Sequence, residues 1–201
     1  MRIPRCAPSL AVATALVLGT GHPAAAQART HAIELTLSAG AFVPTGNEGP
    51  GATSGLGRGT AALGSAHLSF NARRGWLTTE FEAGYAAERI RETNGALAYN
   101  QRTNLFYGAA KLQVGRNPRL PGVSYLVGAG PALILRRKSV LDPTSGQTNL
   151  GGAAMATFRI PIDGQVGARF DAQDLVYRAD FGLGSKLRND FGVTLGLSIA
   201  Y

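Results

Sequence analysis

Cysteine, charge and long hydrophobic runs are all scarce in this sequence. The 201 residues include one cysteine, Cys6, so a disulfide within the chain is excluded as a source of stability. Charged residues make up only 16 %, which is less than a soluble enzyme of this size usually carries. Beyond the N-terminus, the longest nearly apolar stretch, 123–135, contains glycine and proline and is too short for a membrane-spanning helix. These shortages argue against a disulfide scaffold, a soluble enzyme and a helical membrane protein.

The N-terminal segment has the organisation of an export signal. Arg2 and Arg5 form a charged start, the apolar stretch LAVATALVLG follows at 10–19, and small residues ending in AAAQA occupy 24–28. This order is typical of a secretory signal peptide with an A-x-A cleavage site. We predict that 1–28 are the signal peptide, with cleavage after Ala26 or Ala28, and that 29–201 form the mature domain. Cys6 leaves with the signal peptide, so the exported chain is predicted to lack cysteine.

From residue 33 onward, apolar residues recur with a period of two. Large apolar residues alternate with small or weakly polar ones, as in FGVTLGLSIAY at 191–201, which is typical of strands with one apolar face. Glycine is abundant at 27 residues, roughly double its average use. The pattern predicts an all-β chain with eight strands, at 33–43, 60–70, 76–88, 103–115, 123–136, 150–160, 165–173 and 191–201.

The connections between these strands alternate in length. Those after the second, fourth and sixth strands are short, and those after the first, third, fifth and seventh are longer and more polar. Long loops at one end, short turns at the other and an even number of strands are typical of barrels that cross an outer membrane. Lipid offers no water to the backbone N–H and C=O groups, so strands cross it only as a closed barrel. We therefore predict an eight-stranded antiparallel up-and-down transmembrane β-barrel.

Aromatic residues fall where such a barrel meets the two membrane–water interfaces. Aromatic rings favour the headgroup level, so each end of the lipid face is expected to carry a girdle of them. The register predicts outward-facing aromatics near the short-turn end and near the long-loop end: Phe70, Tyr125 and Tyr201 at the first, and Tyr85, Phe106 and Phe191 at the second.

The alternating strand that ends on Tyr201 resembles the ending of a known family. That family is the small eight-stranded outer-membrane β-barrel proteins, which include the transmembrane domain of outer-membrane protein A. The resemblance covers roughly 33–201 and implies insertion into the outer membrane of a Gram-negative-type bacterium. In the family, the barrel assembly machinery reads the last strand, so the resemblance implies that role for Val193, Leu195, Leu197, Ile199 and Tyr201.

The face opposite the lipid is predicted to carry the charges. With the register set by the apolar face, the inward residues include Glu34, Glu80, Glu82, Glu88, Lys111, Arg136, Arg159, Arg169 and Asp171. An eight-stranded barrel is just wide enough for side chains to fill it, and buried charges must pair. We predict a plugged lumen in which Glu80 and Glu82 meet Lys111 and Arg169. The alternative is a narrow aqueous interior in which these residues pair only loosely.

One pair of residues has a spacing known from enzymes. His67 and Ser69 share a strand face, and some small outer-membrane barrels are lipid A deacylases with a His-x-Ser pair. Here the register points the pair into the lumen, and the sequence shows no third, orienting carboxylate of the kind that nucleophilic catalysis needs. Lumen packing is therefore the predicted role, with no catalytic residue. No cysteine–histidine cluster suggests a metal, and no cofactor is predicted.

The basic balance of the chain bears on its partners. Loss of Arg2 and Arg5 with the signal peptide lowers the formal charge from +8 to +6. For an outer-membrane protein the nearest anions are the phosphates of lipopolysaccharide, so nucleic acid is not an expected partner. Basic residues in or beside the long loops are interspersed with acidic ones, including Asp174 and Asp190. A solvated mixed-charge surface is thus the default interpretation, and a lipopolysaccharide site is the alternative.

Together these observations predict an integral outer-membrane protein with a structural or surface-interaction role. Its partners would be outer-membrane lipid and, during insertion, the assembly machinery. A narrow channel for small solutes is the first alternative, and it requires an open lumen. A lipid-modifying enzyme would require His67 and Ser69 to face lipid, and a soluble periplasmic barrel would not partition with the outer membrane.

Overall fold

The computed structural model describes residues 33–45, 54–72, 76–94, 97–116, 122–137, 146–180 and 185–201. The predicted signal peptide lies outside these residues. The described part of the chain consists of strands and turns, with no helix long and apolar enough to cross a membrane. Its strands are β1 (Ile33–Thr45), β2 (Ser54–Gly59), β3 (Ala61–Asn71), β4 (Leu77–Asn94), β5 (Leu97–Arg116), β6 (Ser124–Arg137), β7 (Gln147–Asp163), β8 (Val166–Asp180) and β9 (Ser185–Ala200).

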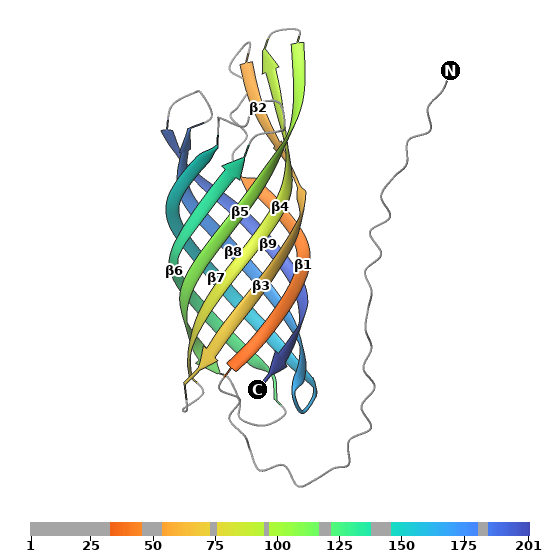
Figure 1. Ribbon diagram of the computed structural model, residues 1–201, viewed down its shortest axis with the longest axis vertical. Coiled ribbons are helices and arrows are strands. Elements are labelled where there is room, and N and C mark those ends of the chain that lie inside the picture. Colours follow the sequence, from red (N-terminus) through yellow and green to blue (C-terminus); the bar gives the residue numbers. More distant parts are fainter. Residues whose placement is uncertain are drawn as a thin grey trace, which may run out of the picture.

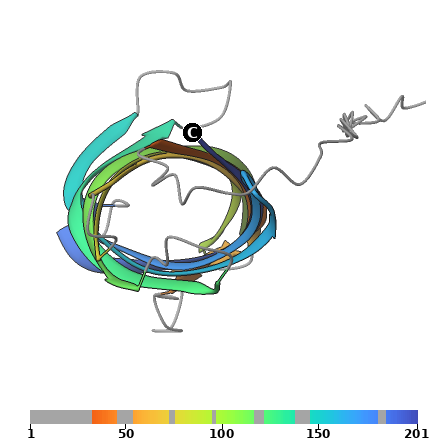
Figure 2. The same ribbon diagram turned by 90° about the horizontal axis from the view of Figure 1, so that it is seen from below.

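Eight of the nine strands form a closed antiparallel barrel (Figures 1 and 2). Each neighbour in the order β1, β3, β4, β5, β6, β7, β8, β9 pairs with the next, and β9 pairs back with β1 from Glu34↔Ala200 to Thr45↔Asn189. Tyr201 continues this seam, because its backbone N–H donates to the Ile33 carbonyl at 2.8 Å. The closed ladder confirms the predicted fold class, and the C-terminus lies at the end drawn lowest in Figure 1, here called the lower end.

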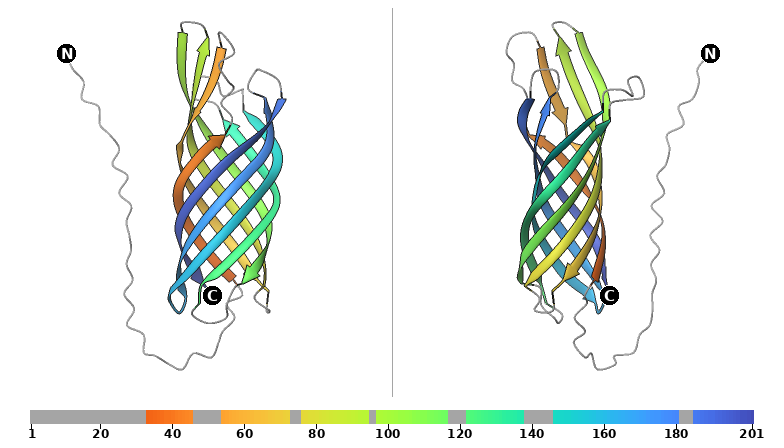
Figure 3. Two further views of the ribbon diagram at one scale, coloured as in Figure 1. Left: turned by 180° about the vertical axis from the view of Figure 1, so that it is seen from behind. Right: turned by 60° about the vertical axis from the view of Figure 1, so that its left-hand side comes forward.

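The upper halves of several strands extend further than the alternation predicts. The segment 89–102, predicted as a loop, is a paired hairpin of β4 and β5 up to Asn94↔Leu97. The segment 174–188, also predicted as a loop, belongs largely to β8 and β9. The prediction failed there because polar residues break the apolar alternation where the strands rise beyond the lipid-facing zone. The hairpin projects above the rim of the barrel together with β2 (Figure 3).

The short strand β2 is the upper part of the same barrel strand as β3. Both pair with β4, but the register shifts by one residue between Gly59↔Arg89 and Leu63↔Ala86, as expected of a β-bulge at Thr60. A one-residue shift exchanges the two faces of a strand. Arg58 is therefore buried inside the barrel, whereas the inward residues of β3 all have odd numbers.

The outer surface of the barrel is a continuous apolar band. Large residues such as Leu37, Phe81, Leu112, Val127 and Leu195 are exposed on it, as lipid contact requires. The structure places all six predicted interfacial aromatics on this surface, each more than a third exposed: Phe70, Tyr85, Phe106, Tyr125, Phe191 and Tyr201. Tyr85 and Phe106 form a cross-strand pair with ring centroids 4.9 Å apart. The structure also leaves the C-terminal residues Leu195, Leu197 and Ile199 exposed, and Val193 partly so.

A charge in the middle of this band is predicted to cost more than the same charge at its edge. Leu195 lies midway between Phe191 and Tyr201 and is 65 % exposed, and Leu187, nearer the upper rim of β9, is 66 % exposed. We expect Leu195→Arg to destabilise the barrel by about 2–4 kcal/mol and Leu187→Arg by about 0–1 kcal/mol, because the cost depends on depth in the lipid. Urea unfolding of the protein in lipid vesicles measures both. Equal effects would contradict the assigned lipid band.

Several glycines face inward where a large side chain lies across them. A Cβ atom on Gly84 would lie 2.1 Å from the ring of Tyr107, so the ring occupies the space above the bare backbone. Gly192 meets Leu63 in the same way, at 3.0 Å from the methyl carbon Cδ2. By contrast, Gly64 faces outward and a Cβ there would meet nothing within 4 Å. Part of the unusual glycine content thus lets large inward side chains fit inside a narrow barrel.

Replacing Gly84 and Gly64 by alanine should show whether the Tyr107 ring, and not the loss of a glycine as such, determines the change in stability. We expect Gly84→Ala to destabilise the barrel by about 1–3 kcal/mol, because the new methyl group forces the Tyr107 ring out of its position. Gly64→Ala, with open space around it, should leave the stability unchanged or raise it by about 0.4–1 kcal/mol. The free energies of unfolding of the two variants give the comparison. Similar losses in both would show that the inward packing is not the cause.

Candidate functional site

The interior of the barrel is where the chemistry-bearing side chains gather. The structure turns all nine predicted inward charges toward the lumen and buries all of them except Arg159, which is half-buried: Glu34, Glu80, Glu82, Glu88, Lys111, Arg136, Arg159, Arg169 and Asp171. Arg159 is the least buried of them, with its side chain 17 % exposed, and its guanidinium donates to Glu34 at 2.6 Å near the lower end. The alternation of each strand fixes these directions, because successive side chains point to opposite faces.

A central charged layer crosses the lumen at mid-height. It comprises His67, Glu80, Glu82, Lys111, Arg169 and Asp171, from strands β3, β4, β5 and β8. Lys111 lies 3.2 Å from a Glu80 oxygen and also binds Glu82. Arg169 donates to Glu80 at 2.7 Å and to Asp171 at 2.9 Å. Each carboxylate therefore has a cation within contact distance, as buried charges require.

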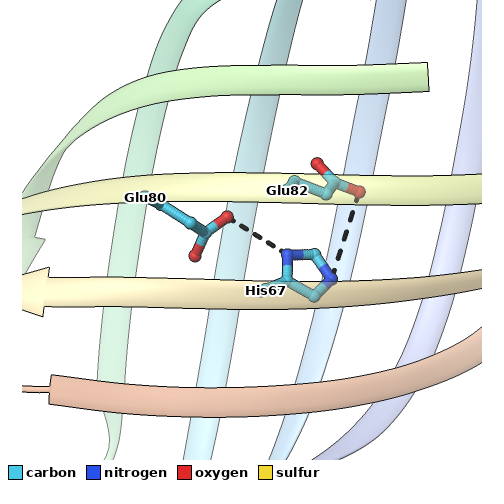
Figure 4. A group of neighbouring side chains, drawn as sticks. All are labelled: His67, Glu80 and Glu82. Carbon is cyan, nitrogen blue, oxygen red and sulfur yellow. Dashed lines mark hydrogen bonds and ion pairs between the residues drawn. The ribbon is translucent and has the colours of Figure 1, made fainter.

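His67 lies among the carboxylates of this layer. Its Nδ1 is 3.2 Å from Glu80, and its Nε2 is 4.0 Å from Glu82 (Figure 4). The same Nε2 is 3.8 Å from Asp171. Ligand atoms of His67, Glu80 and Glu82 lie within 4.8 Å of one another, close enough in principle for a metal ion. Lys111 and Arg169 already neutralise these carboxylates, so an added dication would have to displace a buried ammonium group. The arrangement fits ion pairing better than metal binding.

The same histidine belongs to a serine–histidine–glutamate chain. The Ser65 hydroxyl lies 3.0 Å from Nε2 of His67, whose Nδ1 faces Glu80. The sequence analysis found no carboxylate to orient His67, but Glu80 fills that position. It also paired His67 with Ser69, whereas the hydroxyl beside His67 is that of Ser65, and Ser69 donates to Glu80 at 2.9 Å. All four side chains are buried. Catalysis also needs substrate access and donors aimed at the reacting oxygen, so burial of the whole chain of side chains fits lumen packing better than catalysis.

A second set of charges lies in the upper region of the lumen. This upper charged layer consists of Arg58, Glu88, Arg136 and Asp190, with the Tyr177 hydroxyl. Arg58 donates to both Asp190 oxygens at 2.7 Å and also binds Glu88. Arg136 lies 3.1 Å from Asp190 and 3.3 Å from Glu88. The bidentate geometry of Arg58 on Asp190 is the strong form of such a pair.

An apolar layer separates the two charged layers. Its side chains are almost completely buried and come from strands all around the barrel: Phe42, Leu63, Ala86, Leu105, Ile134 and Leu175. Tyr107 and Tyr177 belong to the same cluster, and their hydroxyl groups reach Glu82 below and Asp190 above. The lumen is therefore a stack of charged, apolar and charged layers linked by two tyrosines.

Below the central layer, the lumen is looser. A small cavity with room for about one water molecule lies among Glu34, Ser69, Gln113, Thr157 and Arg159. Gln113 is fully buried, and neither polar atom of its amide has a partner among the described residues. A polar group left in this state is costly unless water reaches it.

Several interior residues were missed or misplaced from the sequence. Asp190 and Arg188 were assigned to a surface loop, but both are buried inside the barrel on β9. Arg58 lay in a segment predicted as a loop, and the alternation alone could not reveal the bulge that turns it inward. Asp174, also assigned to a loop, lies on the outer face of β8. A signal was present for β9, because the even-numbered alternation of its inward face continues back to Arg188.

Comparison with known proteins agrees with this geometry at the level of the fold. Neisserial surface protein A matches with a TM-score of 0.62 and 10% identity, over 85% of this chain and 97% of that one. The outer membrane protein OprG from Pseudomonas aeruginosa matches with a TM-score of 0.61, 10% identity and the same coverage. The outer membrane protein AlkL matches with a TM-score of 0.57 and 12% identity, over 92% and 97%.

The chain has the fold of the small eight-stranded outer-membrane β-barrels. No protein-family model and no curated protein sequence matches it. With identities this low, the resemblance concerns the outer-membrane barrel architecture alone.

The contacts in the central layer make a specific prediction about coupling. Arg169 binds Glu80 directly, whereas Glu82 is bound by Lys111. A double-mutant cycle of Glu80→Ala and Arg169→Ala should give an interaction energy of about 0.5–3 kcal/mol in the free energy of unfolding. The control cycle of Glu82→Ala and Arg169→Ala should give a smaller value. A larger coupling for the control pair would contradict the assigned pairing.

Proposed function

We propose that this protein is an integral outer-membrane barrel with a non-conducting lumen and a structural or surface-interaction role. The observation that carries the proposal is the filled interior, in which an apolar layer lies between two charged layers. Eight strands enclose just enough space for side chains. A solute crossing the lumen would have to disrupt both buried ion-pair networks and also displace the apolar side chains between them.

The membrane location is supported by the surface of the barrel. Its apolar band, bounded by aromatic residues, would be poorly compatible with water but suits lipid. Export through the predicted signal peptide, 1–28, and recognition of the exposed residues of β9 by the assembly machinery belong to the same proposal. The segments joining the upper strand ends would then face the cell exterior and carry the interactions.

A narrow channel is the second candidate. The small cavity beside Gln113 favours it, because the cavity extends the polar interior from the lower end to Arg169 of the central layer. Water in this cavity would hydrogen-bond to the Gln113 amide, and the ion pairs of the central layer would keep it from moving further up the lumen. This cavity is consistent with a closed pore as well as with a plug, so conduction distinguishes the two candidates. Hydrolysis of lipid is not proposed, since His67 and the serines beside it face away from the lipid.

Single-channel recording of the refolded mature protein in a planar bilayer tests the proposal. We expect a correctly inserted barrel to give no discrete current steps, because both charged layers and the apolar layer would block ions. Protease protection of the strands confirms insertion in the same preparation. Reproducible steps from the inserted wild-type protein would overturn the plug and favour the channel.

A further inference from the structure

Two arginines stand directly opposite each other on the outer face of the barrel. Arg89 on β4 and Arg102 on β5 are Cα partners in the antiparallel ladder, and both are exposed. Directly paired residues on antiparallel strands have Cα atoms about 4.5–5.5 Å apart. Like charges so placed repel each other and weaken the sheet. A sheet of this kind gains stability when an anion lies between the two guanidinium groups.

A third arginine extends the pair across the next strand. Arg137 on β6 is the Cα partner of Asn104, which lies two residues from Arg102 on β5. Diagonal neighbours of this kind are about 7–8 Å apart. The Tyr85 hydroxyl donates to Oδ1 of Asn104 at 3.0 Å, which leaves the amide nitrogen of Asn104 as a further donor beside Arg137. We call Arg89, Arg102, Asn104 and Arg137 the outer arginine cluster.

Among the side chains that the structure describes, no carboxylate neutralises this cluster. Among the described residues, Arg89, Arg102 and Arg137 have no ion-pair or hydrogen-bond partner of their own. Glu88, the nearest acidic residue along β4, points inward and binds Arg58 and Arg136. Beside Arg89, the partner residue on β2 is Gly59, where a Cβ would meet nothing closer than 3.8 Å. The positive charge of the cluster is therefore not neutralised by a described side chain, and the cluster is open on the side of Gly59.

The height of the cluster matches the headgroup region of a membrane. Arg89 and Arg102 lie four residues above Tyr85 and Phe106, the aromatic pair at the upper edge of the apolar band. Four residues span about 13 Å along a strand, or about 10 Å along the axis of a barrel with tilted strands. Arg137 lies two residues above Leu135, the partner of Phe106, and thus closer to the hydrocarbon. Flexible arginine side chains reach from these positions to phosphate groups at the lipid surface.

We propose that the outer arginine cluster binds the phosphate groups of a phosphorylated glycolipid of the outer leaflet, of the lipopolysaccharide type. Two guanidinium groups in direct opposition suit one phosphate, because arginine forks bind phosphate oxygens in pairs. Arg137 and Asn104 lie nearer the lipid and suit a second phosphate or a sugar hydroxyl of the same headgroup. Acyl chains of that glycolipid would then lie against Tyr85, Phe106 and Leu135 below. The inference rests on the proposed membrane location.

The experiment compares unfolding in vesicles of two compositions. The wild-type barrel and the variant Arg89→Gln/Arg102→Gln/Arg137→Gln are inserted into phosphatidylcholine vesicles with or without lipopolysaccharide, and the unfolding midpoint is measured. The matched control is Arg116→Gln, which removes an exposed charge from the lower end of the same strand, β5. We expect lipopolysaccharide to raise the midpoint of the wild type and of the control, and to raise that of the triple variant little or not at all.

Two further readouts separate the proposal from its rivals. Without lipopolysaccharide, the triple variant should be at least as stable as the wild type, since it loses a repulsion; a merely structural role for the arginines would lower its midpoint in both lipids. The apparent affinity for lipopolysaccharide should fall by about tenfold or more in the triple variant, as expected from the loss of charge-assisted hydrogen bonds.

The outcomes that overturn the inference are distinct from those that overturn the membrane location. An equal midpoint shift in wild type and triple variant would refute the cluster as the binding site. Full competition by inorganic phosphate, or an equal shift with phosphatidylglycerol, would replace the glycolipid with a general phosphate site and so refute it too. Failure of the wild-type barrel to insert into any vesicle would instead refute the proposed function.

Discussion

The closed ladder of backbone hydrogen bonds is the constraint on which every other feature depends. The pairing of β9 with β1 removes the sheet edges that lipid could not tolerate. Closure with eight strands then fixes the width of the interior, and the alternation of each strand decides which side chains occupy it. The charged layers, the apolar layer and the outer arginine cluster are all consequences of these directions. A different number of strands, or a different register between β9 and β1, would alter all of them together.

The sequence was most informative where one physical rule acts without competition. Strict alternation predicted the fold, the inward direction of Glu80, Lys111 and Arg169, and the outward direction of Tyr85 and Phe106, because the lipid demands an apolar residue at every second position. It failed above the lipid, where neither face of a strand needs to be apolar, so the β4–β5 hairpin and Asp190 were mistaken for loops. The sequence also could not predict which cation binds which carboxylate, because those pairs form across the lumen between strands that are distant in the chain.

The interior combines two ways of filling a barrel that differ in their demands. Ion pairs such as Arg58–Asp190 require specific partners, and losing one leaves an uncompensated buried charge. Apolar contacts such as Leu105 and Ile134 require only volume and tolerate exchange more readily. Tyr107 and Tyr177 join the two types, with rings in the apolar cluster and hydroxyl groups on Glu82 and Asp190. Because the charged side chains are buried next to this apolar layer, their electrostatic attraction is stronger than it would be in water.

The bulge at Thr60 lets the two segments of one barrel strand share an inward face although their residue numbers differ in parity. Gly59 and Thr60 are both exposed, so Arg58 and Ala61 on either side of them both point into the barrel. Deleting Thr60 would join β2 to β3 in one continuous register, with Gly59 still opposite Arg89 and Arg58 still beside Asp190 and Glu88. Adding a residue there, with the bulge otherwise kept, would shift β2 by one position against β4 and turn Arg58 outward, toward Arg89 and Arg102. Loss of this codon is therefore compatible with both faces of the barrel, whereas gain of one would unbalance both at once.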